Sequence, residues 1–443
     1  MTTEGPEPRN CASSGRSLDL RHILELPIDE QYKSFPINEP PLLISDVAAQ
    51  RWNALEAPFS TPLMLLKQES LRHNLQVMRD YCQRHAVSLA PHCKTPLAPQ
   101  LAQLQLDAAA WGFTVANVHQ ARVLHRAGAT RLLIANEVID SVSAKWLAQA
   151  LAADRDLELF CLVDSIEGAQ LLHEHLAACV VQRPLSVLLE LGIPGGRCGC
   201  RSVDEALLVA TEIGRLETLQ LAGIEVYENL FPIEHVEQTI ADIAALLARF
   251  RDLALRLDER GFFASGQEII FTGGGSMWFD LVVAGLNERV HLSRPIRQVL
   301  RAGSYLTHDA FNYDELSPFG QRNIGEGTLH QALELWARVI SMPESGLAIL
   351  DFGKRDAAHD RGFPRPFVAK TGNFTEQLDS ADYKVFHLND QHARLRIPDH
   401  SILSVGDLVG CHISHPCTSF DNWRLIPMVD GDYMVVDAIR SFL

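Results

Sequence analysis

Short apolar runs alternate with longer amphipathic segments over most of the chain, and this alternation constrains the fold more than any other feature. Segments such as 70–85 and 240–261 carry apolar residues at helical spacing. The runs between them are almost continuously apolar, which is typical of strands buried on both faces of a parallel sheet. The runs expected to be strands are 62–67, 87–92, 109–116, 131–136, 157–164, 185–192, 221–228, 268–275 and 298–306.

Strands joined by helices in this order indicate an α/β fold. Eight or nine strand–helix units in about 250 residues match the size of a (β/α)₈ barrel, and a doubly wound open sheet is the alternative. After about residue 311 the pattern changes to short strands separated by turn residues, with little helix. We therefore predict a (β/α)₈ barrel followed by an all-β domain. The later strand candidates lie in 333–342, 347–353, 383–397, 407–415 and 433–442.

These patterns divide the chain into four parts. Residues 1–17 are rich in Ser, Gly, Pro and charge, and we expect them to be disordered. Residues 18–67 form an N-terminal segment, residues 68–311 form the barrel, and residues 312–443 form the all-β domain.

Charge and cysteine usage exclude some classes of function. The 39 Lys and Arg residues are outnumbered by 55 Asp and Glu residues, giving a net charge of −16. This balance disfavours binding to nucleic acids or to anionic membranes. No apolar run approaches the ~20 residues that span a bilayer, and the N-terminus lacks the apolar stretch of a secretory signal. Nine cysteines without a disulfide-like spacing favour a reducing compartment, so we expect a cytoplasmic protein.

Residues with useful chemistry follow several predicted strands, where barrel enzymes carry their active sites. Lys94 follows a strand in "PHCKT", Arg197 lies in "GGRCG", and Tyr227 lies in "VYE". Two glycine turns, "TGGGS" and "RAGSY", follow the last two barrel strands. Such turns let backbone N–H groups converge on an anion such as a phosphate. The turn residues of interest are Gly274, Gly275, Ser276, Gly303 and Tyr305.

A phosphate cradle together with a lysine at a strand end is what pyridoxal 5'-phosphate (PLP) requires. The phosphate anchors the cofactor, and the lysine holds its aldehyde as a Schiff base. Arg197 could bind the phenolate oxygen of the cofactor, and Tyr227 could contact its ring or the substrate. Each residue also has an ordinary alternative: Lys94 on a surface turn, Arg197 as an exposed charge, and Tyr227 packed at a strand end.

The segment "CHISHPCTSFDNW" contains three potential metal ligands, Cys411, His415 and Cys417. On a strand, His415 and Cys417 would point to the same face, because side chains alternate. An imidazole nitrogen and a thiolate suit Zn²⁺. Two protein ligands leave positions open for water or substrate, as a catalytic metal requires. The alternative is a buried free cysteine beside a hydrogen-bonded histidine.

Two other segments carry polar residues that could line a site. The stretch 351–364 contains six charged or titratable side chains between Lys354 and Arg361, and His392 lies in "NDQH". We interpret most of the stretch as a solvated loop whose ion pairs contribute little. A turn position explains His392 at least as well as a site does.

Taken in order, these motifs resemble the pattern of D-threonine aldolases and metal-dependent D-serine dehydratases, which are PLP enzymes with the alanine racemase-like fold. The resemblance runs from about residue 58 to the C-terminus and joins a lysine motif to a metal motif more than 300 residues away. The motifs that carry it are "PHCKT", "GGRCG", "VYE", "TGGGS", "RAGSY", "DFGKRD", "DQH" and "SHPCTSFDNW".

The resemblance implies a PLP-binding barrel and a metal-bearing β domain, usually assembled as a homodimer. It also implies that the run 62–67 belongs to the β domain, so that residues 18–67 partly join that domain. The implied cofactor-binding residues are Lys94, His92, Arg197, Tyr227, Gly274, Gly275, Ser276, Gly303 and Tyr305, with Lys94 also catalytic. The implied ligands of a divalent metal are His415 and Cys417.

The identity of the second metal ligand favours one activity of the family. Aldolases often carry aspartate there, whereas dehydratases usually carry cysteine, and this chain has Cys417, which favours zinc. We therefore expect a lyase that converts D-3-hydroxy amino acids such as D-serine into a 2-oxo acid and ammonia. A D-threonine aldolase, which would release glycine and an aldehyde, is the alternative, and a non-catalytic PLP-binding protein is a third possibility. At "YENLF" the chain departs from the many relatives that have glycine after Tyr-Glu.

Overall fold

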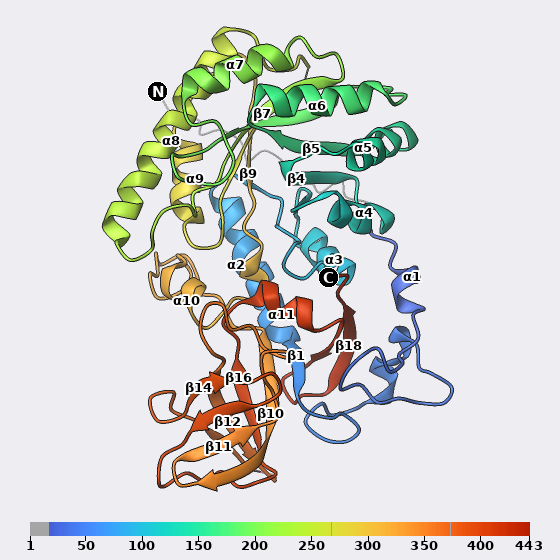
Figure 1. Ribbon diagram of the computed structural model, residues 1–443, viewed down its shortest axis with the longest axis vertical. Coiled ribbons are helices and arrows are strands. Elements are labelled where there is room, and N and C mark those ends of the chain that lie inside the picture. Colours follow the sequence, from blue (N-terminus) through green and yellow to red (C-terminus); the bar gives the residue numbers. More distant parts are fainter. Residues whose placement is uncertain (1–16, 267, 373) are drawn as a thin grey trace, which may run out of the picture. The chain divides into compact units, whose positions relative to one another are not determined.

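The computed structural model describes residues 17–266, 268–372 and 374–443 (Figure 1). Most of the predicted disorder, at residues 1–16, lies outside the described residues. Contacts within the chain divide it into two compact units. The barrel unit contains Met78–Lys94 and Ala102–Gly303, and the β unit contains Asp19–Val77, Thr95–Leu101 and Ser304–Leu443. The short segment after Lys94 therefore leaves the barrel unit for the β unit and then returns.

Eight parallel strands form the sheet of the barrel unit, in the order β2-β9-β8-β7-β6-β5-β4-β3. A parallel bridge between His92 and Thr114 joins the two ends of this sheet and nearly closes it. The predicted α/β barrel is thus confirmed, and the open doubly wound sheet is wrong. The strands are β2 (Ser88–Leu89), β3 (Phe113–Val115), β4 (Arg131–Glu137), β5 (Glu158–Val163), β6 (Leu185–Leu191), β7 (Leu219–Val226), β8 (Ile269–Gly273) and β9 (Ile296–Leu300).

Apolar side chains fill the inside of the barrel, where nearly every strand contributes to one buried cluster. Leu188 of β6 belongs to this cluster, so Glu190, two residues further along, points to the same side. Glu190 pairs with Glu225 of β7 in the strand register, and the two carboxyl groups therefore lie on the inner face. The apolar core consequently ends in a polar layer at the carboxyl ends of the strands.

Helices follow the strands and cover them in Figure 1. Four of the turns that lead from a strand into a helix carry an N-cap side chain that accepts a hydrogen bond from the backbone N–H three residues on: Asn117, Asp140, Ser165 and Ser202. These caps set where each helix begins. The helices are α2 (Gln68–Arg84), α3 (Pro99–Asp107), α4 (Val118–Arg126), α5 (Ser141–Ala153), α6 (Ile166–Ala177), α7 (Val203–Ile213), α8 (Val236–Glu259) and α9 (Phe279–Asn287).

The β unit is built on a mostly antiparallel sheet with the order β13-β12-β16-β10-β1-β17-β18, from which β11, β15 and β14 continue. Strand β1, the run predicted at 62–67, lies between β10 and β17 in this sheet, not in the barrel. The strands are β1 (Leu63–Lys67), β10 (Leu333–Glu344), β11 (Leu347–Leu350), β12 (Arg365–Thr371), β13 (Phe374–Gln377), β14 (Lys384–Leu388), β15 (Ala393–Arg396), β16 (Leu408–His412), β17 (Leu425–Val429) and β18 (Val435–Arg440).

The N-terminal segment packs onto this sheet. Ile23, Tyr32 and Val47 are buried in one cluster with Leu65 of β1 and Trp336 of β10, which explains why an irregular segment stays ordered. Short helices complete the unit: α1 (Arg21–Leu24), η1 (Ile44–Asp46), η2 (Ala48–Gln50), η3 (Ser304–Leu306), α10 (Asn312–Leu316) and α11 (Pro416–Asn422).

None of the helices in the described ranges is both long enough and apolar enough to cross a lipid bilayer.

Gly223 is required by close strand packing in the barrel, so replacing it should be costly. It pairs with Ile270 of the next strand, and a Cβ atom at Gly223 would overlap the Ile270 carbonyl oxygen. We expect Gly223→Ala to destabilise the protein by about 1–3 kcal/mol, measured as a fall in the thermal midpoint.

Gly214 provides the matched control for this substitution. It follows α7 with ordinary helical torsions, and a Cβ atom there would meet its nearest neighbours at 3.6 Å. Gly214→Ala should change the stability by no more than about 0.5 kcal/mol. Equal midpoints for the two variants would contradict the packing argument.

Candidate active site

The lysine segment follows β2 and is fixed by backbone hydrogen bonds to both of its neighbours. The N–H of His92 donates to the carbonyl of Arg301 at 3.1 Å, and the N–H of Cys93 donates to the carbonyl of Thr114 at 2.7 Å. The N–H of Lys94 donates to Nδ1 of His92 at 3.4 Å. Lys94 therefore lies just beyond the carboxyl end of β2, and its side chain is partly exposed.

His92 is a neutral hydrogen-bond acceptor surrounded by cations. Burial, followed by the positive charges of Lys94, Arg301 and Arg197, holds the pKa of His92 well below its usual range. An uncharged ring can keep Nδ1 free of a proton to accept the Lys94 N–H. Three cationic side chains therefore gather around one neutral ring, and such a set favours an anionic ligand.

Arg197 and Tyr227 come from the segments after β6 and β7, and the structure brings them together. The guanidinium carbon of Arg197 lies 4.2 Å from the centroid of the Tyr227 ring. Burial, together with the nearby Glu228, raises the pKa of the Tyr227 phenol, which therefore keeps its proton and can donate a hydrogen bond. Arg197 is exposed, as its ordinary alternative expects, although it lies over the Tyr227 ring, so its role toward a cofactor stays a prediction.

The glycine turn after β8 presents backbone N–H groups to an acidic side chain. Gly274 has a φ of 93°, a conformation that side chains rarely adopt. The N–H of Gly275 donates to Oε1 of Glu228 at 2.6 Å, and a Cβ atom at Gly275 would overlap the amide of Asn229. Burial raises the pKa of Glu228, which favours its neutral form. An anion at this turn would thus meet an uncharged carboxyl group.

The second glycine turn lies next to the lysine segment. A Cβ atom at Gly303 would overlap the carbonyl oxygen of His92, so only glycine allows this close backbone approach. Tyr305 is buried in η3 of the β unit, whereas Ser276 is partly exposed. A role in phosphate binding for Gly303, Tyr305 and Ser276 stays a prediction.

The residues of the barrel unit fit PLP. Lys94 supplies the amine, the turn at Gly274 and Gly275 supplies backbone N–H groups where a Cβ atom would overlap neighbouring side chains, and Arg197 supplies a cation. Each matches one part of the cofactor: its aldehyde, its phosphate and its phenolate oxygen.

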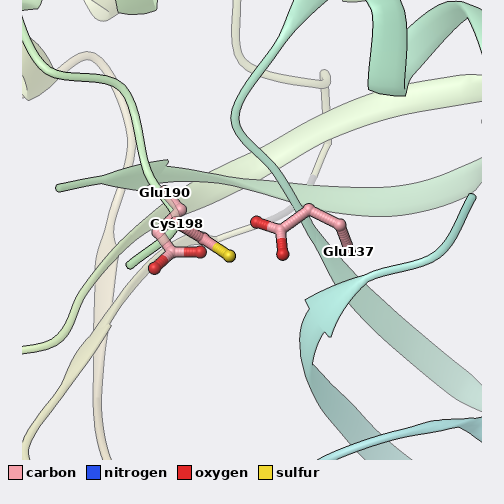
Figure 2. A group of neighbouring side chains, drawn as sticks. All are labelled: Glu137, Glu190 and Cys198. Carbon is pink, nitrogen blue, oxygen red and sulfur yellow. The ribbon is translucent and has the colours of Figure 1, made fainter. Parts of the chain in front are cut away.

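A cluster of acidic groups that the sequence analysis missed lies at the same end of the barrel. One ligand atom each from Glu137, Glu190 and Cys198 lie within 4.8 Å of one another (Figure 2). Burial, then the charge of Glu225 and a hydrogen bond with Glu137, raise the pKa of Glu190 to about 10. Burial, then the charge of Glu137, raises the pKa of the Cys198 thiol to about 12. Because Glu190 and Cys198 hold their protons and Glu190 hydrogen-bonds to Glu137, we interpret the group as a proton-sharing cluster.

A buried ion pair balances the charge beside this cluster. Arg301 donates to a carboxylate oxygen of Glu225, and the two side chains are 4% and 0% exposed. The signal in the sequence for both Glu190 and Glu225 was a glutamate that ends an otherwise apolar strand.

The metal motif of the β unit lies on a helix, so the strand predicted for His415 and Cys417 is wrong. His415 is the N-cap of α11, Pro416 is the first helical residue, and Cys417 lies in the first turn. Proline suits this position because its ring fixes φ and the missing N–H would have no helical partner. Strand β16 ends at His412, so an alternation argument cannot be extended to His415.

Hydrogen bonds hold both candidate ligands. Nδ1 of His415 lies 2.6 Å from Oδ2 of Asp360, which also accepts a bond from Thr418 at its other oxygen. Sγ of Cys417 lies 3.0 Å from Oγ1 of Thr95. With Nδ1 engaged by a carboxylate, Nε2 of His415 is the nitrogen left to bind a metal.

The two side chains fit a divalent metal, and the third candidate does not join them. Burial lowers the pKa of His415. The hydrogen bond with Cys417 and the charges of Cys417 and Asp360 raise it by more than burial lowers it, so that the pKa is about 9. A metal would displace that proton. An imidazole and a sulfur side by side match the preferences of zinc. Among the described residues, Cys411 forms no three-ligand group with the other two; it is buried in β16.

The charged stretch 351–364 is more ordered than we expected. Asp356 is buried, and it bonds to Lys33 at 2.9 Å, while Asp360 contacts His415. Our interpretation as a solvated loop therefore fails for the buried Asp356, whereas Asp360 is exposed and forms an ion pair, as that interpretation expects. His392 is exposed beside a turn, in line with the ordinary alternative.

Comparison with known proteins supports the same two-part organisation. Residues 66–286 match a family model described as "Alanine racemase, N-terminal domain", and residues 332–429 match one described as "Putative serine dehydratase domain". D-threonine aldolase of Arthrobacter sp is 26% identical over 389 residues, 86% of this chain and 91% of that protein. The chain belongs to the family of D-threonine aldolases and D-serine dehydratases. Another similar protein, 3-hydroxy-D-aspartate aldolase of Paracoccus denitrificans (strain Pd 1222), is 24% identical over 372 residues, 83% of this chain and 88% of that protein.

Solved structures of the family share the fold. The crystal structure of D-threonine aldolase from Filomicrobium marinum has a TM-score of 0.72 at 26% identity, covering 86% of this chain and 95% of that chain. A cysteine-to-alanine mutant of D-threo-3-hydroxyaspartate dehydratase in the metal-free form has a TM-score of 0.64 at 20% identity, covering 87% and 98%. At that identity the likeness shows the fold alone.

The raised pKa of Glu190 makes stability depend on pH. The folded chain holds the Glu190 proton up to about pH 10, whereas the unfolded chain releases it near the ordinary carboxyl pKa of 4.5. Stability from this group is therefore present at low pH and is lost as the pH rises through that window. Glutamine cannot ionise. The difference in thermal midpoint, Glu190→Gln minus the parent protein, should therefore increase steadily from pH 5 to pH 9.

Glu212→Gln is the control for that pH series. A hydrogen bond from Gln170, aided by Arg215, lowers the pKa of Glu212, so its contribution is complete above about pH 5. The midpoint difference for this variant should stay constant between pH 5 and pH 9. A constant difference for Glu190→Gln as well would show that Glu190 is ionised in the folded protein.

Proposed function

We propose that this chain is a PLP- and metal-dependent lyase that removes water from D-3-hydroxy amino acids. For D-serine the products would be pyruvate and ammonia. The observation that carries the proposal is the pair of His415 and Cys417 at the start of α11, each held by its own hydrogen bond. The pair lies in the segment that matches the serine dehydratase model, and a thiolate ligand favours zinc.

In the barrel unit, Lys94 would hold PLP and later move a proton. PLP, when bound, supplies the electron-withdrawing ring that makes the Cα–H bond of the substrate acidic. The Nζ amine of Lys94, once released from the cofactor, would take the Cα proton of the substrate. Arg197 would neutralise the phenolate oxygen, and the neutral His92 keeps the Lys94 segment in place through Nδ1.

In the β unit, His415 and Cys417 would hold the metal through Nε2 and Sγ. A divalent metal, when bound, supplies a Lewis acid that makes the β-hydroxyl of the substrate a better leaving group. Asp360 accepts a hydrogen bond from Nδ1–H of His415 and so fixes the orientation of the ring. The metal-free form reported for the hydroxyaspartate dehydratase supports a metal site in this family.

A D-threonine aldolase is the second candidate, because both curated relatives described above are aldolases. In that reaction a base removes the β-hydroxyl proton, and the bond between Cα and Cβ breaks. Both activities need the same cofactor and metal groups, so the products distinguish them.

Product analysis with D-threonine separates the two reactions. The protein is supplied with PLP and Zn²⁺, and the products are identified by mass spectrometry. We expect 2-oxobutanoate and ammonia, because loss of the hydroxyl leaves the carbon chain intact. Glycine and acetaldehyde in place of these products would establish the aldolase, and the absence of any product from both D-threonine and D-serine would favour a protein that binds PLP without turnover.

Replacing Cys417 should separate the roles of metal and cofactor. We expect Cys417→Ala to lower kcat by at least about 100-fold, because the metal provides several kcal/mol of charge stabilisation. The visible absorbance of bound PLP should remain, since Lys94 is intact. Cys179→Ser, at a partly exposed cysteine after α6, is the control and should keep full activity. A Cys417→Ala variant as active as this control would remove the metal from the mechanism.

The surroundings of the enzyme are proposed on sequence grounds. The cysteine usage supports a cytoplasmic protein, and the acidic composition disfavours nucleic acid and membranes as partners. The resemblance supports a small D-amino acid as the substrate. The resemblance supports a homodimer. The length of a D-3-hydroxy acid side chain that the site accepts depends on the segment after Tyr227, where this chain has Asn229.

A further inference from the structure

The hydroxyl of Thr95 lies against the sulfur of Cys417. The distance between Oγ1 and Sγ is 3.0 Å, and Thr95 is 2% exposed. Both residues belong to the β unit, although 322 positions separate them in the sequence. A buried hydroxyl at this distance from a sulfur forms a hydrogen bond, and either atom could donate in the metal-free protein.

Metal binding fixes the direction of this bond. A cysteine that binds a metal does so as a thiolate, which has no proton to donate. The Thr95 hydroxyl must then be the donor and Sγ of Cys417 the acceptor. Hydrogen bonds to a charged acceptor are stronger than those between neutral groups, so the contact should strengthen when the metal binds.

The surrounding backbone holds Thr95 in position. Gln100 accepts a bond from the N–H of Arg440 and donates one to the carbonyl of Ala438, both at 2.8 Å. The N–H of Phe442 donates to the carbonyl of Leu97 at 3.1 Å. Three hydrogen bonds therefore attach the segment 95–101 to the end of the chain around β18, and little freedom of the backbone remains to be lost when the metal binds.

We propose that Thr95 is a positioning residue for the metal: its hydroxyl donates to the Cys417 thiolate, holds that sulfur in the ligand orientation and withdraws charge from it. The inference rests on the proposed metal-binding role of His415 and Cys417. Asp360 positions the first ligand, and Thr95 positions the second, so each ligand has one supporting side chain. Because it withdraws charge from the sulfur, the hydroxyl also makes the bound metal a stronger Lewis acid.

The first measurement is metal affinity, which does not depend on activity. Zn²⁺ is titrated against a competing chelator for the parent protein with PLP bound, Thr95→Val, Thr95→Ser and Cys417→Ala. We expect Thr95→Val to bind Zn²⁺ about 10–100-fold more weakly. Thr95→Ser keeps a hydroxyl and should stay within about threefold of the parent protein. Thr95→Ala replaces Thr95→Val if circular dichroism shows that the valine variant does not fold.

The second measurement is the charge-transfer absorbance from thiolate to metal after Co²⁺ replaces Zn²⁺. A thiolate that loses a hydrogen-bond donor holds its electrons less tightly, so the band of Thr95→Val should move to longer wavelength, while the band of Thr95→Ser should stay in place. A purely structural role for Thr95 would lower occupancy without moving the band.

The outcomes separate this inference from the function on which it rests. If Cys417→Ala binds Zn²⁺ as tightly as the parent protein, the metal site is wrong and the role of Thr95 falls with it. If Cys417→Ala loses Zn²⁺ but Thr95→Val keeps both the parent affinity and the parent band, only the inference about Thr95 is overturned. Weaker binding with an unmoved band would likewise reject the donor role.

Discussion

Compensation between buried charges at the carboxyl ends of the barrel strands is the constraint on which the candidate site depends. Arg301 and Glu225 form an ion pair with almost no exposure to water, and removing one partner from such a pair costs roughly 3–5 kcal/mol. Arg301 is also one of the cations that keep His92 neutral. The neutral ring in turn accepts a hydrogen bond from the N–H of Lys94. The lysine segment after β2 therefore depends on a charge pair between β7 and the residue that follows β9.

The architecture could be predicted from the sequence because it depends on periodicity, which is a local property. Continuous apolar runs joined by amphipathic segments specify a parallel barrel, and seven of the predicted barrel runs overlap the observed strands β3 to β9, although β7 and β9 each begin two residues earlier than predicted. Periodicity could not show which of the two sheets contains β1. Its apolar run looks like the others, and only its long-range pairing with β10 and β17 shows that it belongs to the other sheet.

Residue type alone made Lys94, Arg197 and Cys417 candidates for the site, and their roles stay predictions. The candidate site was not predictable where the role comes from a contact between distant segments. Asp360 and Thr95 lie far in sequence from the ligands that they contact, and Glu137 lies near Glu190 only because β4 and β6 flank β5 in the sheet. The strand assigned around His415 was wrong for a different reason: Pro416 favours the first turn of a helix, and this signal outweighs the alternation of the preceding strand.

The central position of β1 has a consequence for the order in which the protein is made. Leu63 pairs with Trp336, and Leu66 pairs with Met428, so β1 leaves the ribosome long before either of its neighbours exists. Its two edges have unpaired backbone groups until almost the whole chain has been synthesised. The barrel strands, in contrast, can pair with neighbours that are close in sequence. During translation β1 therefore stays an unpaired apolar strand, which makes it a target for chaperones and a site of aggregation in the nascent chain.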